Sequence, residues 1–228
     1  MGRRPFIFVN DHFYHVFNRG VNRQSIFLED ADYVRFVHNL YEMNDANPTI
    51  DFRIAQTIYG GPSSVNRRDP IVEILAWCLM PNHFHLMLRQ RADGGIPLFM
   101  KKLGTGYAVY FNKKYERSGY VFQGRFKAVV VEKEGQFLHL SRYIHLNPVD
   151  LVESGWKEEG IKDGGKVHEF LENYRWSSYT DWIGKKNFPS ILNLKGVEGI
   201  FKDSAAYQKF MVSWMAKDSQ TVKPLLFD

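Results

Sequence analysis

Two apolar runs separated by a Pro-Asn pair constrain this chain more than any other feature. The runs span residues 71–80 and 83–89, and Pro-Asn is a turn signal, so they predict two adjacent strands of one sheet. Side chains alternate between the faces of a strand, so His83 and His85 would point the same way. Two imidazoles on one strand face form half of a site for a divalent metal, although a His-x-His pair is often only polar surface.

The remaining pattern predicts an α+β fold. Aromatic and β-branched residues predict strands over 13–18 and 120–132. Apolar residues at helical spacing predict helices over 29–43, 96–115 and 136–147. The order is strand, helix, two strands, helix, strand, helix. It matches the ferredoxin-like split β-α-β plan, an antiparallel sheet with helices mainly on one face.

The chain length allows one large domain or a domain with an appendage. For 228 residues we predict a domain over 1–180, with a loop insertion at about 44–70. Residues 181–228 would form a C-terminal, mostly helical extension whose role is open. Within it, residues 205–215 have the spacing of an amphipathic helix.

Composition bears on partners and compartment. The formal charge of +5 suits an anionic partner, nucleic acid first, although many ordinary proteins carry such a charge. Cys78 is the single cysteine, so an intrachain disulfide is excluded and a reducing compartment fits. Its apolar neighbours indicate core packing and not a nucleophile. No apolar run is long enough for a membrane span, so we expect a cytoplasmic protein with no membrane partner.

The helix predicted over 136–147 offers a second set of chemical groups. Tyr143 and Asn147 are one turn apart on the same stripe, while His145 lies on the opposite side. If this helix covers the histidine strand, two imidazoles and a carboxamide oxygen can hold one Mg²⁺ or Mn²⁺ beside a tyrosine nucleophile. The residue types alone favour a packed helix end over this catalytic set.

Five sequence blocks, in order, carry a family resemblance. They are 17–20 (FNRG), 79–86 (LMPNHFHL), 120–127 (YVFQGRFK), 142–149 (RYIHLNPV) and 176–179 (WSSY). Together they resemble the IS200-like, single-tyrosine (Y1) HUH transposases, and among these the REP-associated tyrosine transposases. The resemblance extends over about residues 12–180.

The resemblance implies an HUH nuclease fold and metal-dependent cleavage and rejoining of single-stranded DNA through a 5′-phosphotyrosine. His83 and His85 match the HUH pair, Tyr143 matches the nucleophile, and Asn147 matches the third metal ligand. Insertion-sequence members more often have glutamine at the Asn147 position, so asparagine points to the REP-associated branch. The implied cofactor is Mg²⁺ or Mn²⁺, and the implied substrate is single-stranded or hairpin, REP-like DNA.

Four cations are candidate DNA contacts in this fold plan. They are Arg19 and Arg23, at and after the end of the first predicted strand, and Arg125 and Lys127, near the start of the strand predicted over 120–132, where they can contact phosphates. Two other functions stay open from the sequence: a domesticated protein that binds DNA hairpins without cutting them, and a nuclease that uses water. A homodimer also stays open, because family members work as dimers or as monomers.

Overall fold

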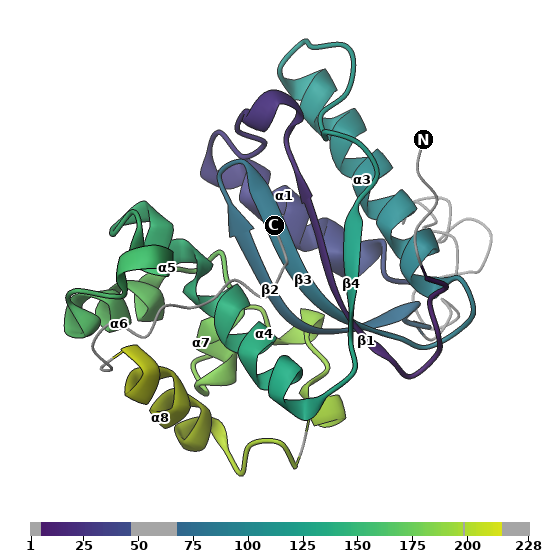
Figure 1. Cartoon of the computed structure of the whole chain (residues 1–228). Helices are drawn as coiled ribbons and strands as arrows, with labels where there is room; N and C mark the ends of the chain where they lie inside the picture. Colours follow the sequence, from purple (N-terminus) through teal and green to yellow (C-terminus); the bar gives the residue numbers. More distant parts are fainter. Residues whose placement is uncertain (1–5, 47–67, 198, 216–228) are drawn as a thin grey trace.

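The computed structural model describes residues 6–46, 68–197 and 199–215. Within them, four antiparallel strands form one sheet in the order β2-β3-β1-β4 (Figure 1). This is the ferredoxin-like strand order that the sequence predicts. The strands are β1 (Phe13–Arg19), β2 (Val72–Met80), β3 (His83–Gln90) and β4 (Lys127–Val131).

Helices alternate with these strands as predicted and continue after the sheet. The longer helices are α1 (Asp30–Glu42), α3 (Gly95–Lys114), α4 (Glu134–Leu146), α6 (Gly164–Asn173) and α8 (Ser204–Met215). Two short α-helices are α5 (Trp156–Glu159) and α7 (Tyr179–Trp182). Short 3-10 helices are η1 (Val21–Arg23), η3 (Asn147–Leu151), η4 (Pro189–Ile191) and η5 (Leu194–Val197).

The two faces of the sheet are covered by different helices. The helices of the split β-α-β plan, α1 and α3, lie behind the sheet in Figure 1 and bury one apolar cluster against it. Helix α4 lies in front, over β2 and β3, and shares a second cluster with α6, α7 and α8. Strand alternation decides which residues meet which cluster. On β3, Phe84 and Leu86 face α1 and α3, whereas Met87 faces the α4 side.

The last strand is shorter than the sequence predicts. The expected strand over 120–132 is reduced to β4, and the residues before it form a loop. Gly124 lies inside the expected run and offers no side chain to pack, which weakens a strand at that point. The loop stays beside the end of β1: Phe122 bridges Gly20, and the Gln123 N–H donates to the Arg19 carbonyl at 2.8 Å.

The WSSY segment extends the sheet at its β2 edge. Ser177 bridges Cys78, and the Ser178 N–H donates to the Trp77 carbonyl at 2.9 Å. The Trp77 N–H in turn donates to the Ser178 hydroxyl at 2.8 Å. The Cys78 thiol is fully buried, which raises its pKa well above the ordinary value, as a core residue requires. This pairing attaches the C-terminal helices to the sheet.

Helix α8 packs against the same core as α4. Its buried residues Tyr207, Met211 and Met215 join the cluster that contains Leu140 and Ile144 of α4. The predicted helix over 205–215 is therefore confirmed, and the domain boundary at residue 180 stays a prediction. Most of the predicted loop insertion, and residues 216–228, lie outside the described residues.

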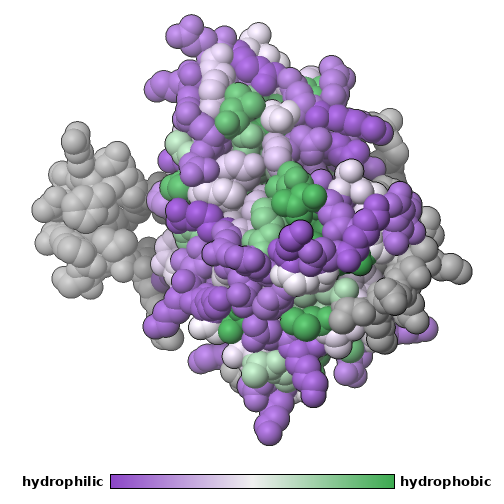
Figure 2. Space-filling model, turned by 90° about the vertical axis from the view of Figure 1, so that its left-hand side faces the viewer, coloured by the Kyte–Doolittle hydropathy of each residue, from purple (hydrophilic) through white to green (hydrophobic). Residues whose placement is uncertain are grey.

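The surface toward α5 and α6 is mostly polar. Figure 2 shows this face with apolar residues in small separate patches among charged and polar ones. Among the described residues, every helix is too short or too polar to cross a membrane.

Candidate active site

Strand β3 and helix α4 bring the predicted nucleophile to the predicted metal ligands. The His83 and His85 rings lie on one face of β3, with centroids 4.9 Å apart. The Tyr143 ring packs edge-on against the His85 ring at 5.4 Å between centroids. The proximity of the His-x-His strand to the tyrosine helix, which the sequence could only suppose, is present in the structure.

His85 is buried and paired with a second histidine. It is 1% exposed, and its Nδ1 lies 2.9 Å from Nε2 of His15 on β1. The two rings stack at 5.1 Å with 17° between their planes. Burial lowers the pKa of His15 to about 3, and burial and the nearby His83 lower that of His85 well below its ordinary value. Both imidazoles are therefore neutral at pH 7, the form that binds metals.

Two of the predicted metal ligands each have a buried atom with no hydrogen-bond partner within the described part of the chain: His85 Nε2 and Asn147 Oδ1. The other end of the Asn147 amide donates to the Tyr143 carbonyl at 2.7 Å, which fixes which atom is the oxygen. Leaving such an atom unpaired costs about 1–3 kcal/mol, so each of the two is a candidate to bind a ligand. An imidazole nitrogen and an amide oxygen fit a divalent cation.

The first histidine of the pair has its ring oriented by the turn. His83 Nδ1 lies 2.6 Å from the Asn82 side-chain oxygen, so Nδ1 donates and Nε2 carries the lone pair. Among the described residues, no three His, Cys, Asp or Glu side chains are grouped to hold a metal. Asn147, the third ligand that the family resemblance implies, is an amide and does not belong to these four types.

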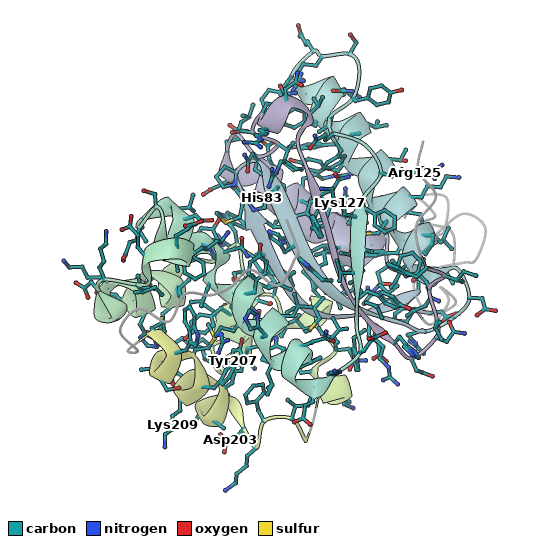
Figure 3. The ribbon with its side chains drawn as sticks, viewed as in Figure 1. His83, Arg125, Lys127, Asp203, Tyr207 and Lys209 are labelled. Carbon is teal, nitrogen blue, oxygen red and sulfur yellow. The ribbon has the colours of Figure 1, made fainter. Side chains whose placement is uncertain are left out.

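A pocket of about 230 Å³ opens on the histidine pair. Three of the four predicted DNA-binding cations line it, and Figure 3 shows His83, Arg125 and Lys127 at the same end of the sheet, away from Tyr207. The pocket thus joins the two predicted histidine ligands to a positive surface, whereas Tyr143 and Asn147 do not line it. Its lining residues are Phe17, Asn18, Arg19, His83, His85, Gln123, Gly124, Arg125 and Lys127.

The fourth predicted cation lies outside this lining. Arg23 is exposed in η1, and its backbone carbonyl accepts from the Asn82 side chain at 3.1 Å. Its position supports the turn before His83, and the structure does not place its side chain in the pocket. Lys114, at the end of α3, is ion-paired with the buried Asp32 at 2.5 Å.

Two residues of the site escaped the sequence analysis. His15 lies in the first strand, where alternation places it on one face with Phe17, but nothing local identifies its partner on β3. Lys157 lies in α5, with its Nζ 5.4 Å from the centre of the Tyr143 ring and 3.1 Å from Asp150. Its short helix has no periodicity that could have indicated the contact.

His145 is directed away from Tyr143, as its place on the helix predicts. Its Nδ1 lies 2.6 Å from the Tyr207 hydroxyl of α8, and its Nε2 lies 2.8 Å from the Ser178 hydroxyl. Burial lowers its pKa to about 3. This histidine connects α4 to α8 and to the segment beside β2, and it does not belong to the site.

Comparisons with known proteins bear on the same segment. Residues 65–147 match the family described as "Transposase IS200 like". The resemblance to IS200-like transposases is confirmed over these residues. The matched segment contains His83, His85 and Tyr143 and ends at Asn147.

A comparison with curated proteins finds no match. Among solved structures, the chain is similar to one described as "Structure of the REP associates tyrosine transposase bound to a REP hairpin". The two share 16% sequence identity with a TM-score of 0.49, over 85% of this chain and 92% of the other.

Proposed function

We propose that this protein cleaves and rejoins single-stranded DNA through a 5′-phosphotyrosine on Tyr143, in a metal-dependent transposase reaction. The observation that carries the proposal is the packing of the Tyr143 ring, 5.4 Å from the His85 ring, beside an imidazole nitrogen with no partner in the described residues. The match of residues 65–147 to IS200-like transposases supports the same reaction class.

The metal ligands in this proposal are His83, His85 and Asn147. His85 Nε2 and Asn147 Oδ1, which have no partner among the described residues, support the assignment, and the Asn82 hydrogen bond places the His83 proton on Nδ1. Mixed nitrogen and oxygen ligation suits Mg²⁺ or Mn²⁺ when phosphate oxygens complete the shell. When bound, the cation supplies a positive charge that stabilises the transition state at the scissile phosphate.

The protein supplies the nucleophile. The Tyr143 oxygen forms a bond to phosphorus, the bond from phosphorus to O3′ breaks, and the phenolic proton ends on O3′ by way of solvent. The products are a 5′-phosphotyrosine and a free 3′-hydroxyl, so rejoining needs no nucleotide cofactor. The Lys157 ammonium, 5.4 Å from the centre of the Tyr143 ring, favours the negative charge that develops on the phenol oxygen.

The DNA would enter along the basic side of the pocket. Arg19, Arg125 and Lys127 line it together with both histidines, so phosphates bound there approach the metal site. Arg23, exposed before the turn, can contact DNA farther along the strand. We assign hairpin DNA of the REP type as the substrate, as the resemblance of the five sequence blocks implies.

The test is a covalent-adduct assay with a labelled single-stranded oligonucleotide library containing hairpins, in Mg²⁺ or Mn²⁺. We expect an adduct that survives denaturing electrophoresis with the unmodified protein and none with Tyr143→Phe, which lacks only the attacking oxygen. Tyr120→Phe is the matched control, because Tyr120 is 86% exposed beside the basic loop and would take up any unselective modification.

Other outcomes would replace the proposal. An undiminished adduct in Tyr143→Phe would remove Tyr143 as the nucleophile. Cut DNA with free 5′-phosphate ends and no adduct would indicate a nuclease that uses water. Salt-dependent hairpin binding without any cleavage would indicate a domesticated DNA-binding protein.

A further inference from the structure

We propose that His15 is a positioning residue for the metal site: its Nε2 accepts a hydrogen bond from His85 Nδ1 and so directs His85 Nε2 to the cation. This inference rests on the proposed function, since it concerns the ligand role of His85. It adds to that function a residue from β1 that lies outside the lining of the pocket.

The geometry leaves one productive arrangement of protons. A neutral imidazole carries its proton on one nitrogen, and a metal must bind the other. His85 Nδ1 is 2.9 Å from His15 Nε2, and His85 Nε2 has no partner among the described residues. For His85 to bind a cation through Nε2, its proton must be on Nδ1, and the acceptor at hydrogen-bond distance is His15 Nε2. Outer hydrogen bonds of this kind fix the tautomer and ring plane of metal-binding histidines.

Burial excludes water from the hydrogen bond between His15 and His85. Both His15 and His85 are almost fully excluded from solvent, at 0% and 1% exposure, so water cannot serve as a substitute acceptor. The stacked rings, 17° from parallel, hold the two imidazoles in one orientation. A ring that cannot rotate presents the same nitrogen to the cation in every molecule.

His15 also contacts the nucleophile. Its ring lies 5.8 Å from the Tyr143 ring in an edge-on arrangement, and on its other side it stacks on Phe17 at 4.7 Å. The same imidazole therefore borders the His85 ligand and the Tyr143 ring. Its removal should disturb the alignment of tyrosine and metal, beyond the loss of one hydrogen bond.

The two histidine ligands are oriented from different parts of the chain. His83 is oriented by its neighbour Asn82 in the turn, whereas His85 is oriented by a residue on the next strand of the sheet. The register of β1 against β3, in which Phe17 lies opposite His85, is what brings His15 into reach. This dependence links the sheet register to the metal site.

The test compares two substitutions that keep different properties of His15. His15→Gln keeps an acceptor oxygen near the position of Nε2, whereas His15→Phe keeps the ring but removes the acceptor. By titration calorimetry with Mn²⁺ in the absence of DNA, we expect His15→Phe to weaken binding about 10- to 100-fold. We expect His15→Gln to stay within a few-fold of the unmodified protein. Circular dichroism and melting curves check that both variants are folded.

A spectroscopic measurement distinguishes positioning from packing. With ¹⁵N-labelled histidine and Mg²⁺, long-range ¹H–¹⁵N spectra should show His85 protonated on Nδ1.

If the His15→Gln and His15→Phe proteins bind Mn²⁺ as tightly as the unmodified protein, or if His85 carries its proton on Nε2 with Mg²⁺ bound, the inference is wrong while the proposed function stands. If the unmodified protein binds no Mn²⁺, the proposed metal site itself fails. If His15→Phe does not fold, weak binding by His15→Gln would overturn the inference, and retained binding together with the Nδ1 proton would support it.

Discussion

His85 and His145 are both fully buried imidazoles, but their hydrogen bonds differ. Both nitrogens of His145 lie within 2.8 Å of a hydroxyl, from Tyr207 and Ser178. His85 has one partner, His15, and its second nitrogen has none in the described part of the chain. In this pair, the histidine that packs inside the fold has both nitrogens bonded, whereas the predicted metal ligand has one nitrogen without a partner in the described residues. Burial alone would not separate the two roles.

The largest difference between these histidines should appear in DNA cleavage. We expect His85→Ala to lower the rate of adduct formation by at least about 10³-fold, because the cation contributes several kcal/mol to the transition state. His145→Gln should lower it much less, because that ring faces away from Tyr143. Single-turnover assays on the same oligonucleotide measure both. Equal losses in the two variants would remove the functional distinction.

Stability should show the opposite order. His145→Ala removes one hydrogen-bond partner from each of the buried hydroxyls of Tyr207 and Ser178 and leaves a cavity, so we expect the free energy of unfolding to fall by about 2–4 kcal/mol. His85→Ala removes a ring whose Nε2 has no partner among the described residues, so we expect a smaller loss in the free energy of unfolding. Urea unfolding in the absence of metal gives both values. A larger loss for His85→Ala would contradict the comparison.

The buried ring of His145 also contributes to the pH dependence of stability. The pKa of His145 is lowered from 6.5 to about 3 by burial, so between these pH values the unfolded chain binds a proton that the folded chain excludes. The stabilisation is complete above about pH 6.5 and is lost as the pH falls toward 3, by at most about 1.4 kcal/mol per pH unit. We expect His145→Gln to have a shallower decrease between pH 7 and 5 in urea unfolding. An unchanged slope would show that His145 does not control it.

The smallest effect concerns the basic edge of the pocket. Arg125→Ala should weaken binding of single-stranded DNA by a few-fold and reduce the slope of log affinity against log salt by about 0.7, the value for one phosphate contact. Lys101→Ala is the control, because Lys101 is an exposed cation on α3 outside the pocket lining. Filter binding at several salt concentrations measures both. The same change for Lys101 would show that only net charge matters.

The sequence predicts the succession of strands and helices, and which side chains share a face, because both depend on local patterns. Alternation puts His83 and His85 on one face, and helical spacing puts Tyr143 away from His145. The partners of these residues depend on register and on distant segments. His15 reaches His85 only through the pairing of β1 with β3, and Lys157 reaches Tyr143 through a helix of four residues. The predicted strand over 120–132 is another case. Its first residues, which include Gly124, form a loop, and only Lys127–Val131 is a strand.

The most direct test of the metal site is electron spin-echo spectroscopy of the protein with Mn²⁺ bound, in the absence of DNA. With ¹⁵N-labelled histidine, the account predicts couplings from two directly bound imidazole nitrogens, one of which disappears in His85→Gln. The His145→Gln protein should keep both. A spectrum without directly bound imidazole nitrogen, or one that changes with His145 and not with His85, would contradict the account.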